Sequence, residues 1–456
     1  MIEALVHKQE TFFNSQQTKE VAFRLKYLKA FKKILIQNED AICEAIYEDF
    51  KKPKFESLVT ETQMVLSELN YIINNLNHWS KPERVSSTLA NLPSFDYIYR
   101  EPYGKTLIIA PWNYPFLLTI SPLIGALAAG NTVVLKPSEL SPHTSAKINE
   151  IVQEVFPEEY VTVVEGGVEV SQELLQQKWD YIFFTGSSHV GKIVYKAAAE
   201  YLTPVTLELG GKNPCVVDNT ASLSLAAKRI AWGKFINAGQ TCVAPDYILV
   251  HQSVKNTFVG ALQKQIHGFY GDPIENSDDF ARITTEKHYQ SLKEKLEGQH
   301  ILFGGGHNDA TRYIEPTLVD EPALDCTLMQ DEIFGPILPI ISYTSEEDLT
   351  QIISQYEKPL SFYVFSKNKA FQERLTTRFG FGGGAINDVV MHIANKNLPF
   401  GGVGNSGIGG YHGKHSFELF SHSKALVKKP NWLDVPFRYP PYKLPTKWIK
   451  YMKHLF

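Results

Sequence analysis

The chain of 456 residues has few cysteines, no excess of basic side chains and no long uninterrupted apolar run. Its four cysteines are scattered and none lies in a C-x-x-C pair, which argues against a disulfide-rich secreted domain. The 45 Lys and Arg residues are outnumbered by 49 Asp and Glu residues, so neither charge nor motif suggests a nucleic-acid partner. The longest apolar run, residues 116–130, is interrupted by polar residues and proline, and it is shorter than the ~20 residues of a membrane span. Because the N-terminus also lacks the basic-then-apolar order of a signal peptide, we expect a cytoplasmic protein.

What is present is an ordinary globular composition, 43% hydrophobic and 21% charged, with enough residues for two or three domains. Apolar residues at steps of three and four predict helices over residues 18–80. Beyond residue 81, short runs that are apolar on both faces alternate with helical segments, as parallel strands do in βαβ units. The expected strands are residues 106–112, 131–137, 160–166, 181–186, 205–211, 214–218, 246–250, 336–343 and 361–366. The sequence therefore predicts an open α/β architecture.

The segment 181–200 has the pattern of a strand, a tight turn and a helix, and the turn carries Gly186 and Gly191. Such a turn lets the backbone approach a diphosphate at the helix N-terminus, where the partial positive charge favours anions. Only two of the three glycines of a G-x-G-x-x-G motif are present, so this segment alone is better explained as an ordinary strand-to-helix turn.

A second feature favours a dinucleotide, because Lys136 and Glu139 follow an expected strand, where such residues can bind the adenosine ribose. Glu139 would repel a 2′-phosphate and so favours NAD, whereas Lys136 leaves NADP possible. The alternative for this pair is a solvated ion pair in a loop.

The stretch INAGQTCVAP, residues 236–245, places a single thiol, Cys242, among small and polar residues. A thiol reacts as the thiolate and needs a polar, partly open pocket, which residues 239–241 allow. The alternative is a small buried hydrophobe, an interpretation that suits Cys43 and Cys215 better. From this stretch alone, a nucleophile and a structural cysteine are equally well supported.

A carboxylate and an amide on two other segments favour a catalytic role for Cys242. Glu208 ends an apolar strand before a Gly-Gly turn, where burial would raise its pKa toward that of a general base. The alternative for Glu208 is a structural ion pair with Lys212 or another cation. Asn113 follows another expected strand, and its amide can donate to a developing oxyanion. The alternative for Asn113 is the capping of a turn.

Six short motifs occur in the order, and at the spacing, of the aldehyde dehydrogenase superfamily. They are PWNYP (111–115), KPSE (136–139), FTGS (184–187), ELGGK (208–212), GQTC (239–242) and EIFGP (332–336). Longer stretches, such as MQDEIFGPILPI and LPFGGVGNSGIGGYHGKHSFELFSH, resemble the class 3 branch, which includes fatty aldehyde dehydrogenases. The resemblance covers nearly the whole chain.

The resemblance implies an NAD-dependent oxidation of aldehydes to carboxylic acids, with NADP possible, no metal, and medium- or long-chain aliphatic or aromatic aldehydes as substrates. It implies that Cys242 is the nucleophile, Glu208 the general base and Asn113 the oxyanion donor. The alternatives are a non-catalytic binding or structural protein that retained the fold, and a redox sensor acting through Cys242.

The resemblance also implies residues for the cofactor and for the aldehyde. The cofactor residues are Ile109, Pro111, Trp112, Lys136, Glu139, Gly186, Ser187, Val190, Leu209, Glu332 and Phe334. The aromatic walls of the aldehyde pocket are Tyr114, Phe116 and Phe400. Met64 stands where class 3 relatives can carry a tyrosine, so the chain-length preference stays open.

The implied fold has a Rossmann-like NAD-binding domain, an α/β catalytic domain and a small β element for bridging or oligomerisation, and it implies a homodimer. The expected boundaries are 1–83 and 104–207 for the helical N-terminal part with the cofactor domain, 208–400 for the catalytic domain, 84–103 and 401–430 for the bridging element, and 431–456 for a C-terminal tail.

The end of that tail is basic, and an expected helix there has one apolar face. The lysines are Lys443, Lys447, Lys450 and Lys453, and the apolar residues are Trp448, Met452 and Leu455. We expect this helix to pack on a partner subunit or to gate the mouth of the pocket. Peripheral contact with an anionic membrane surface is the less favoured alternative.

Overall fold

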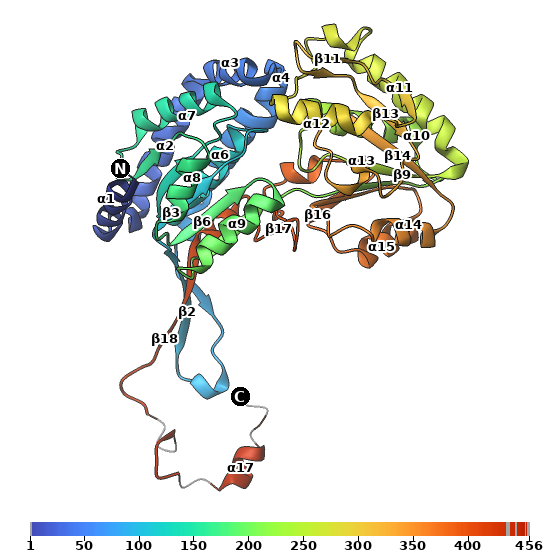
Figure 1. Ribbon diagram of the computed structural model, residues 1–456. Coiled ribbons are helices and arrows are strands. Elements are labelled where there is room, and N and C mark those ends of the chain that lie inside the picture. The colour runs from blue at the N-terminus through green and yellow to red at the C-terminus, as the bar shows by residue number, and fades with distance from the viewer. Residues whose placement is uncertain (1, 435–437, 443–444, 452, 454–456) are drawn as a thin grey trace.

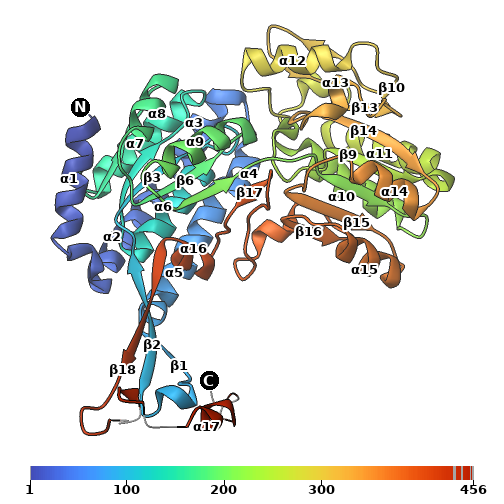
Figure 2. The same ribbon diagram turned by 60° about the horizontal axis from the view of Figure 1, so that its bottom comes forward.

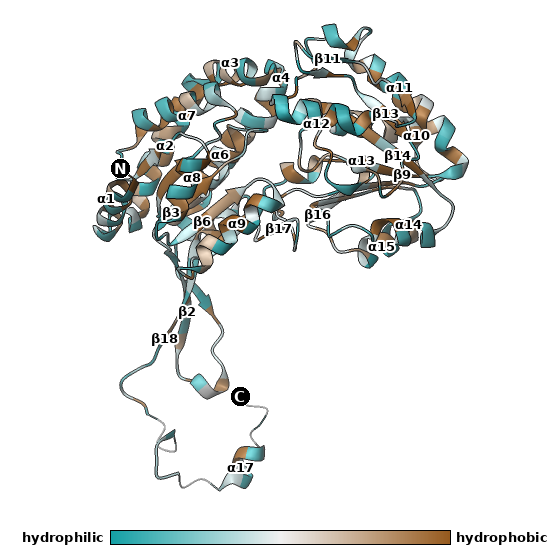
Figure 3. Cartoon of the chain, viewed as in Figure 1, coloured by the Kyte–Doolittle hydropathy of each residue, from teal (hydrophilic) through white to brown (hydrophobic). Residues whose placement is uncertain are grey.

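The computed structural model describes residues 2–434, 438–442, 445–451 and 453. Two α/β lobes lie side by side, and a β-sheet arm extends from the first lobe toward the C-terminal segment (Figure 1). Hydrophobic residues concentrate on the strands of both lobes and on helix α6, whereas the outer helices α11 and α12 are largely polar toward solvent (Figure 3).

The first lobe begins with a set of helices, as predicted for residues 18–80. They are α1 (Ile2–Asn14), η1 (Gln17–Lys19), α2 (Val21–Gln37), α3 (Glu39–Phe50), α4 (Lys54–Ser57), the π-helical turn η2 (Leu58–Thr62) and α5 (Gln63–Trp79). In α2, Leu28, Phe31 and Leu35 are buried, so the spacing of three and four does form the packed face. Helix α1 precedes the predicted helical range.

A six-stranded sheet forms the centre of the first lobe, in the order β17-β7-β6-β3-β4-β5. Its strands are β3 (Lys105–Ile109), β4 (Thr132–Lys136), β5 (Val161–Val163), β6 (Tyr181–Thr185), β7 (Val205–Glu208) and β17 (Gly407–Ile408), and all neighbours are parallel except β17 with β7. The intervening helices are α6 (Leu117–Ala129), α7 (Pro142–Val155), α8 (Val168–Leu175) and α9 (Ser188–Ala199). Helices cover both faces, since Ile108 packs with α2, α5, α6 and α7 while its neighbour Leu107 packs with α1, α8 and α9. This explains why the strands are apolar on both faces.

The strand order of this sheet reverses between β3 and β6, because the chain runs from β3 to β4 and β5 before it returns to β6. Ligands of open α/β sheets bind outside the carboxyl ends of the strands at such a reversal. The segments that follow β3 and β6 carry Asn113 and Gly186, so both reach this crevice.

The second lobe contains a seven-stranded sheet, in the order β10-β13-β14-β9-β8-β15-β16. Its strands are β8 (Pro214–Val217), β9 (Tyr247–His251), β10 (Ile301–Phe303), β13 (Thr317–Asp320), β14 (Ile337–Tyr343), β15 (Ser361–Phe365) and β16 (Gly383–Ile386). The helices are α10 (Leu223–Phe235), α11 (Lys255–Tyr270), α12 (Glu286–Leu296), α13 (Thr327–Gln330), α14 (Glu346–Ile353) and α15 (Lys369–Arg378), and a hairpin joins β11 (His307–Asn308) to β12 (Tyr313–Ile314).

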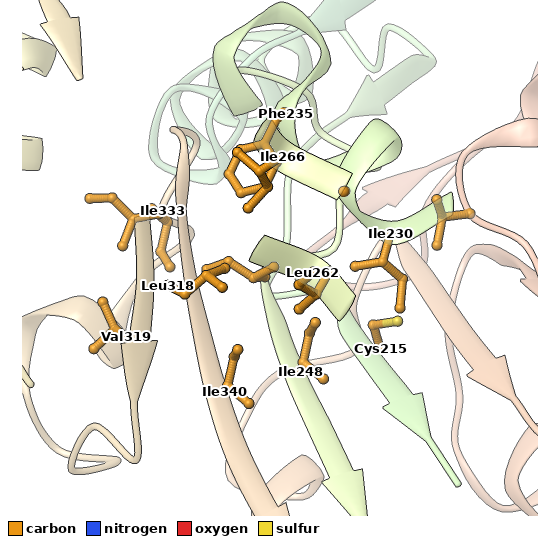
Figure 4. Close-up of a cluster of buried hydrophobic side chains, with 14 of the residues drawn as sticks. Cys215, Ile230, Phe235, Ile248, Leu262, Ile266, Leu318, Val319, Ile333 and Ile340 are labelled. Carbon is orange, nitrogen blue, oxygen red and sulfur yellow. The ribbon is translucent and has the colours of Figure 1, made fainter. Parts of the chain in front are cut away.

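One face of the second sheet packs against α10 and α11 to form the largest apolar core (Figure 4). Cys215 lies in this core and is fully buried, which confirms its interpretation as a structural cysteine. The other face packs against α14 and α15.

The arm is a three-stranded antiparallel sheet in the order β1-β2-β18, built from β1 (Glu83–Val85), β2 (Phe95–Pro102) and β18 (Ser421–Lys428). In both views it projects away from the two lobes (Figures 1 and 2). Its strands come from the two ranges expected to form the bridging element. The second of those ranges also contains β17, which pairs with β7, and α16 (Lys414–Leu419), which packs against α6.

The C-terminal segment includes a short helix, α17 (Thr446–Tyr451), in which Trp448 is 62% exposed. In both views α17 lies beyond the arm and away from the lobes, so it does not gate a pocket of its own chain (Figures 1 and 2). Lys443, Met452 and Leu455 lie outside the described residues. In the part of the chain that the structure describes, no helix is long and apolar enough to cross a membrane.

Candidate active site

A cavity of about 480 Å³ lies where the carboxyl ends of β3, β6 and β7 face loops of the second lobe. Cys242, Glu208 and Asn113 all line it, although they come from three distant segments of the chain. The structure therefore brings the predicted thiol, carboxylate and amide together.

The thiol of Cys242 is held on a loop that requires small residues. Before it, in η4 (Ile236–Gly239), the backbone is left-handed at Asn237 (φ 55°), Ala238 (φ 51°) and Gly239 (φ 74°). A Cβ on Gly239 would lie 2.3 Å from the carbonyl oxygen of Gly335, so only glycine fits there. The small residues thus allow this loop to approach the backbone that leads into β14.

Burial raises the pKa of the Cys242 thiol above its usual range, and the nearby carboxylates of Glu332 and Glu208 raise it further. The backbone N–H groups of Cys242 and Val243 act in the opposite direction. The thiol is consequently protonated at neutral pH, and its proton must leave before the sulfur can act as a nucleophile.

Glu208 ends β7 and is 3% exposed, and among the described residues neither of its carboxylate oxygens has a hydrogen-bond partner. Burial raises the pKa of this carboxyl well above its usual value. The alternative of an ion pair with Lys212 is wrong, because the Lys212 ammonium bonds Asp246 at 2.7 Å instead. An orphaned buried carboxyl on a cavity wall needs a ligand or a proton, and this suits a general base.

Asn113 is buried and connects the loop after β3 to the loop of Cys242. The side-chain nitrogen of Asn113 donates to the backbone carbonyl of Gln240 at 3.1 Å. The backbone carbonyl of Asn113 accepts a hydrogen bond from the side-chain nitrogen of Asn237 at 2.9 Å. An amide nitrogen carries two hydrogens, so one N–H stays available for a ligand in the cavity.

Several predicted cofactor residues line the same cavity: Pro111, Trp112, Gly186, Ser187, Leu209, Glu332 and Phe334. Ser187 is the N-cap of α9, and its side chain accepts from the N–H of Val190. The ring of Phe334 stands edge-on to that of Trp112 at 5.5 Å. Burial raises the pKa of Glu332 to about 8, against the lowering effects of the Gly211 N–H and two lysines.

The remaining predicted cofactor residues lie at the same edge of the sheet but outside the cavity. Lys136 ends β4 and is buried, and it bonds the partly exposed Glu139 at 2.8 Å. The two residues therefore form the ion pair of the alternative interpretation, but only Glu139 is in contact with solvent. Ile109 packs in the core under α9, and Val190 is 41% exposed on the surface of that helix. These residues therefore lie near the cavity, at the same edge of the sheet, but do not line it.

Of the residues predicted for the aldehyde pocket, Tyr114 and Phe400 line the cavity. The Tyr114 hydroxyl lies 2.7 Å from that of Thr241, and the Phe400 ring stacks on His412 with centroids 5.2 Å apart. Phe116 does not line the cavity. Its side chain points into the core of the first lobe, because the chain turns into α6 directly after it.

Sequence reasoning missed most of this wall. The further lining residues are Val59, Thr60, Leu117, Leu118, Thr185, Gly210, Trp232, Ile236, Thr241, Val243, Leu360, Val390, Met391, Ile393, Ala394, Tyr411 and His412, together with Met64. They come from segments far apart in the chain, and no local pattern connects them.

The residues present fit a nicotinamide dinucleotide. The N-terminus of α9 at Ser187 offers backbone N–H groups to a diphosphate. Gly210 lies so close to Glu332 that a Cβ would be 1.9 Å from its Oε2, which keeps this carboxylate at the cavity wall beside Cys242.

A thiol, two carboxylates and an amide around one cavity, at the reversal point of a parallel sheet, define a dinucleotide-dependent enzyme. The chain belongs to the aldehyde dehydrogenase family, whose model matches residues 1–426, and it uses NAD(P) to oxidise aldehydes.

Relatives with established names agree with this assignment. The chain is 49% identical over 452 residues to the 4,4'-diaponeurosporen-aldehyde dehydrogenase of Staphylococcus aureus, covering 99% of this chain and 98% of that one. It is 43% identical over 442 residues to the dimeric NADP-preferring aldehyde dehydrogenase of Canis lupus familiaris, covering 96% and 98%. It is also 43% identical to aldehyde dehydrogenase family 3 member A2 of Pongo abelii, covering 96% and 91%, which confirms the resemblance to class 3.

Solved structures agree as well. The substrate-bound state of Staphylococcus aureus AldH superimposes with a TM-score of 0.97 at 48% identity, covering 99% of each chain. A Mycobacterium tuberculosis aldehyde dehydrogenase complexed with NAD+ gives a TM-score of 0.82 at 29% identity, covering 92% of this chain and 87% of that one.

Proposed function

We propose that this aldehyde dehydrogenase works through a covalent thioester on Cys242, with Asn113 as oxyanion donor and Glu208 as general base. The convergence of these three side chains on one cavity is the observation that supports the assignment. Neither a non-catalytic protein nor a redox sensor needs a buried, unpaired carboxyl and an amide beside the thiol.

In the first stage, the Cys242 thiol releases its proton to solvent, and the sulfur adds to the aldehyde carbonyl carbon. The carbonyl oxygen then carries negative charge, which the Asn113 amide and the Cys242 backbone N–H stabilise. Such a donor contributes about 3–4 kcal/mol to the transition state. NAD(P)+, when bound, supplies the hydride acceptor, and loss of the hydride from the former aldehyde carbon leaves a thioester on the sulfur.

In the second stage, the Glu208 carboxylate takes a proton from a water molecule, which attacks the thioester carbon. The carbon–sulfur bond breaks and the carboxylic acid leaves. The proton that Glu208 took from water passes to the sulfur, which restores both the thiol and the carboxylate. Because burial raises the pKa of Glu208 well above its usual value, the fraction of the active carboxylate form should increase with pH.

The proposed cofactor residues are the predicted ones. Gly186 and Ser187 would bind the diphosphate, Lys136 and Glu139 the adenosine ribose, and Glu332 the nicotinamide ribose. Ile109, Pro111, Trp112, Val190, Leu209 and Phe334 would pack around the cofactor.

The proposed substrates are medium- or long-chain aliphatic or aromatic aldehydes. The wall beyond Cys242 is apolar, with Leu117, Leu118, Trp232 and Met391 among its residues, and an apolar wall favours an apolar substrate. The name of the Staphylococcus aureus relative adds 4,4'-diaponeurosporen-aldehyde as a substrate worth testing.

We also propose a cytoplasmic homodimer in which the arm and the C-terminal tail contact the partner subunit. Exposed apolar side chains in this part of the chain support the proposed dimer. Leu426 on β18 is 42% exposed, and Trp432, which follows β18, is 79% exposed. Contact of the basic tail with anionic vesicles is the alternative, and vesicle sedimentation tests it.

The experiment that tests the proposed function is a matrix of aldehydes against both cofactors, followed by the absorbance of the reduced cofactor. We expect turnover with NAD or NADP that increases with the apolar length of the aldehyde. Cys242→Ser should abolish turnover while cofactor binding stays within about twofold, because serine is a far weaker nucleophile. Absence of reduction with every aldehyde, or turnover by Cys242→Ser, would contradict the proposal.

A further inference from the structure

We propose that two glutamates of the first lobe, Glu56 and Glu61, are positioning residues. They fix the position of the Asn113 amide relative to the Cys242 sulfur. Neither residue lines the cavity, but each accepts hydrogen bonds from a loop that does. This inference rests on the roles proposed above for Asn113 and Cys242.

Glu61 accepts hydrogen bonds from the residues that follow Asn113 in its loop. One of its carboxylate oxygens accepts the N–H groups of Phe116 and Leu117 at 2.9 and 3.1 Å, where α6 begins. The other oxygen bonds the Lys52 ammonium at 2.7 Å, and both side chains of this ion pair are fully buried. The same ammonium lies 3.9 Å from the centre of the Tyr114 ring. The residues on the C-terminal side of Asn113 are therefore fixed by one buried ion pair.

Glu56 holds the loop of Cys242. Its carboxylate accepts the N–H of Asn237 at 2.7 Å, at the residue where the backbone turns left-handed. The Asn237 side chain in turn donates to the carbonyls of Asn113 and Gln240, at 2.9 and 3.1 Å. Glu56 thus fixes the residue that links the two loops to each other.

The two glutamates lie five positions apart on one short stretch of chain, α4 and η2, which also contributes Val59 and Thr60 to the cavity wall. A single rigid stretch therefore determines the distance between the amide donor and the sulfur. Burying charged carboxyls costs stability. Precise alignment of reacting groups repays such a cost in rate, since a displacement of about 1 Å can cost about 100-fold.

The test compares Glu56→Ala with Glu56→Gln, because glutamine can still accept the Asn237 N–H and alanine cannot. We expect Glu56→Ala to lower kcat/KM about 10- to 100-fold while the cofactor dissociation constant stays within twofold. Glu56→Gln should restore most of the activity. Glu48→Ala, on the exposed part of α3, is the matched control.

A double-mutant cycle distinguishes positioning from general stabilisation. In an Asn113→Ala background, Glu56→Ala should lower kcat/KM by less than about threefold, because the amide that it positions is gone. Equal losses in both backgrounds, or wild-type kcat/KM in Glu56→Ala, would overturn the inference. If Asn113→Ala itself keeps full activity, the role proposed for Asn113 fails instead, and this inference fails with it.

The double variant Lys52→Met/Glu61→Leu provides a second test, in which both members of the buried ion pair are removed together. We expect a folded protein, verified by circular dichroism, whose kcat/KM is at least about tenfold lower than that of the wild type. When Asn113→Ala is already present, the same double substitution should lower kcat/KM only slightly. A folded double variant with wild-type kcat/KM would overturn the part of the inference that concerns Glu61.

Discussion

Burial raises the pKa values of three acidic groups of the cavity, the thiol of Cys242 and the carboxyls of Glu208 and Glu332. Burial therefore opposes the accumulation of negative charge in this cavity. Cys242 acts as a nucleophile, and Glu208 as a base, only in the deprotonated form.

This arrangement predicts how the reactivity of Cys242 depends on pH. In the cofactor-free protein, the rate of alkylation of Cys242 by iodoacetamide should still be rising at about pH 10, where a free cysteine, with a pKa of ~8.5, is almost fully ionised. The alkylation rate increases with pH because only the thiolate reacts, and the raised pKa of the thiol moves this increase to higher pH. Peptide mass spectrometry separates Cys242 from the half-buried Cys326. A plateau below pH 7.5 would mean that the thiol is already ionised at neutral pH.

Residue-level prediction from the sequence selected Cys242, Glu208 and Asn113, and the structure places all three on one cavity. Their short stretches alone left structural alternatives open, and the family resemblance decided between them. Residue-level prediction failed for Phe116, which is close to Asn113 in sequence but is turned into the core by the start of α6. It also could not find Glu56 or Glu61, because a glutamate on a helix has the same pattern whether it is solvated or bonded to a distant loop.

At the scale of elements, strands β3 to β9, β14 and β15 were predictable because parallel strands covered on both faces are apolar runs. The strands β10, β13, β16 and β17 of the same two sheets were not predicted. Strands β2 and β18 of the arm were not predicted as strands. They are partly or largely exposed, and they pair across more than three hundred residues of sequence, so no local signal marks them. The left-handed turn of η4 was indicated only indirectly, by the small residues before Cys242.

That turn gives a prediction at the element scale. Gly239→Ala should destabilise the protein by at least about 1–3 kcal/mol, because alanine is strained at φ 74° and its Cβ would clash with the Gly335 carbonyl at 2.3 Å. Thermal unfolding measures the change. Gly260→Ala is the control, since this glycine lies within α11 with nothing near its Cβ, and there alanine should stabilise by about 0.5–1 kcal/mol. Equal melting temperatures for the two variants would contradict the account of the turn.

At the scale of the whole molecule, the two lobes and the cavity between them form one functional unit, whereas the arm and tail extend away from it (Figure 1). The sequence resemblance predicted the lobes and their order. The outward position of α17 could not be derived from its basic and aromatic composition, which suits a gate as well as a partner contact.

The proposed homodimer gives a prediction at this scale. Light scattering should report a mass of twice 51.5 kDa. Replacing the exposed Leu426 and Val427 of β18 by glutamate should shift it toward 51.5 kDa, because charge on that apolar surface opposes association. Ile36→Glu, at an exposed position of α2, should leave the mass unchanged. A monomeric wild-type protein at micromolar concentration would contradict the proposed dimer.

The central claim, a covalent thioester on Cys242, is tested most directly by mass spectrometry of Glu208→Gln after mixing with an aldehyde and NAD(P)+. Without the base, hydrolysis of the thioester should become slow, so we expect one burst of reduced cofactor per subunit. The peptide that carries Cys242 should then be heavier by one acyl group less a hydrogen. Steady reduction of cofactor with this peptide unmodified at every time point would contradict the account.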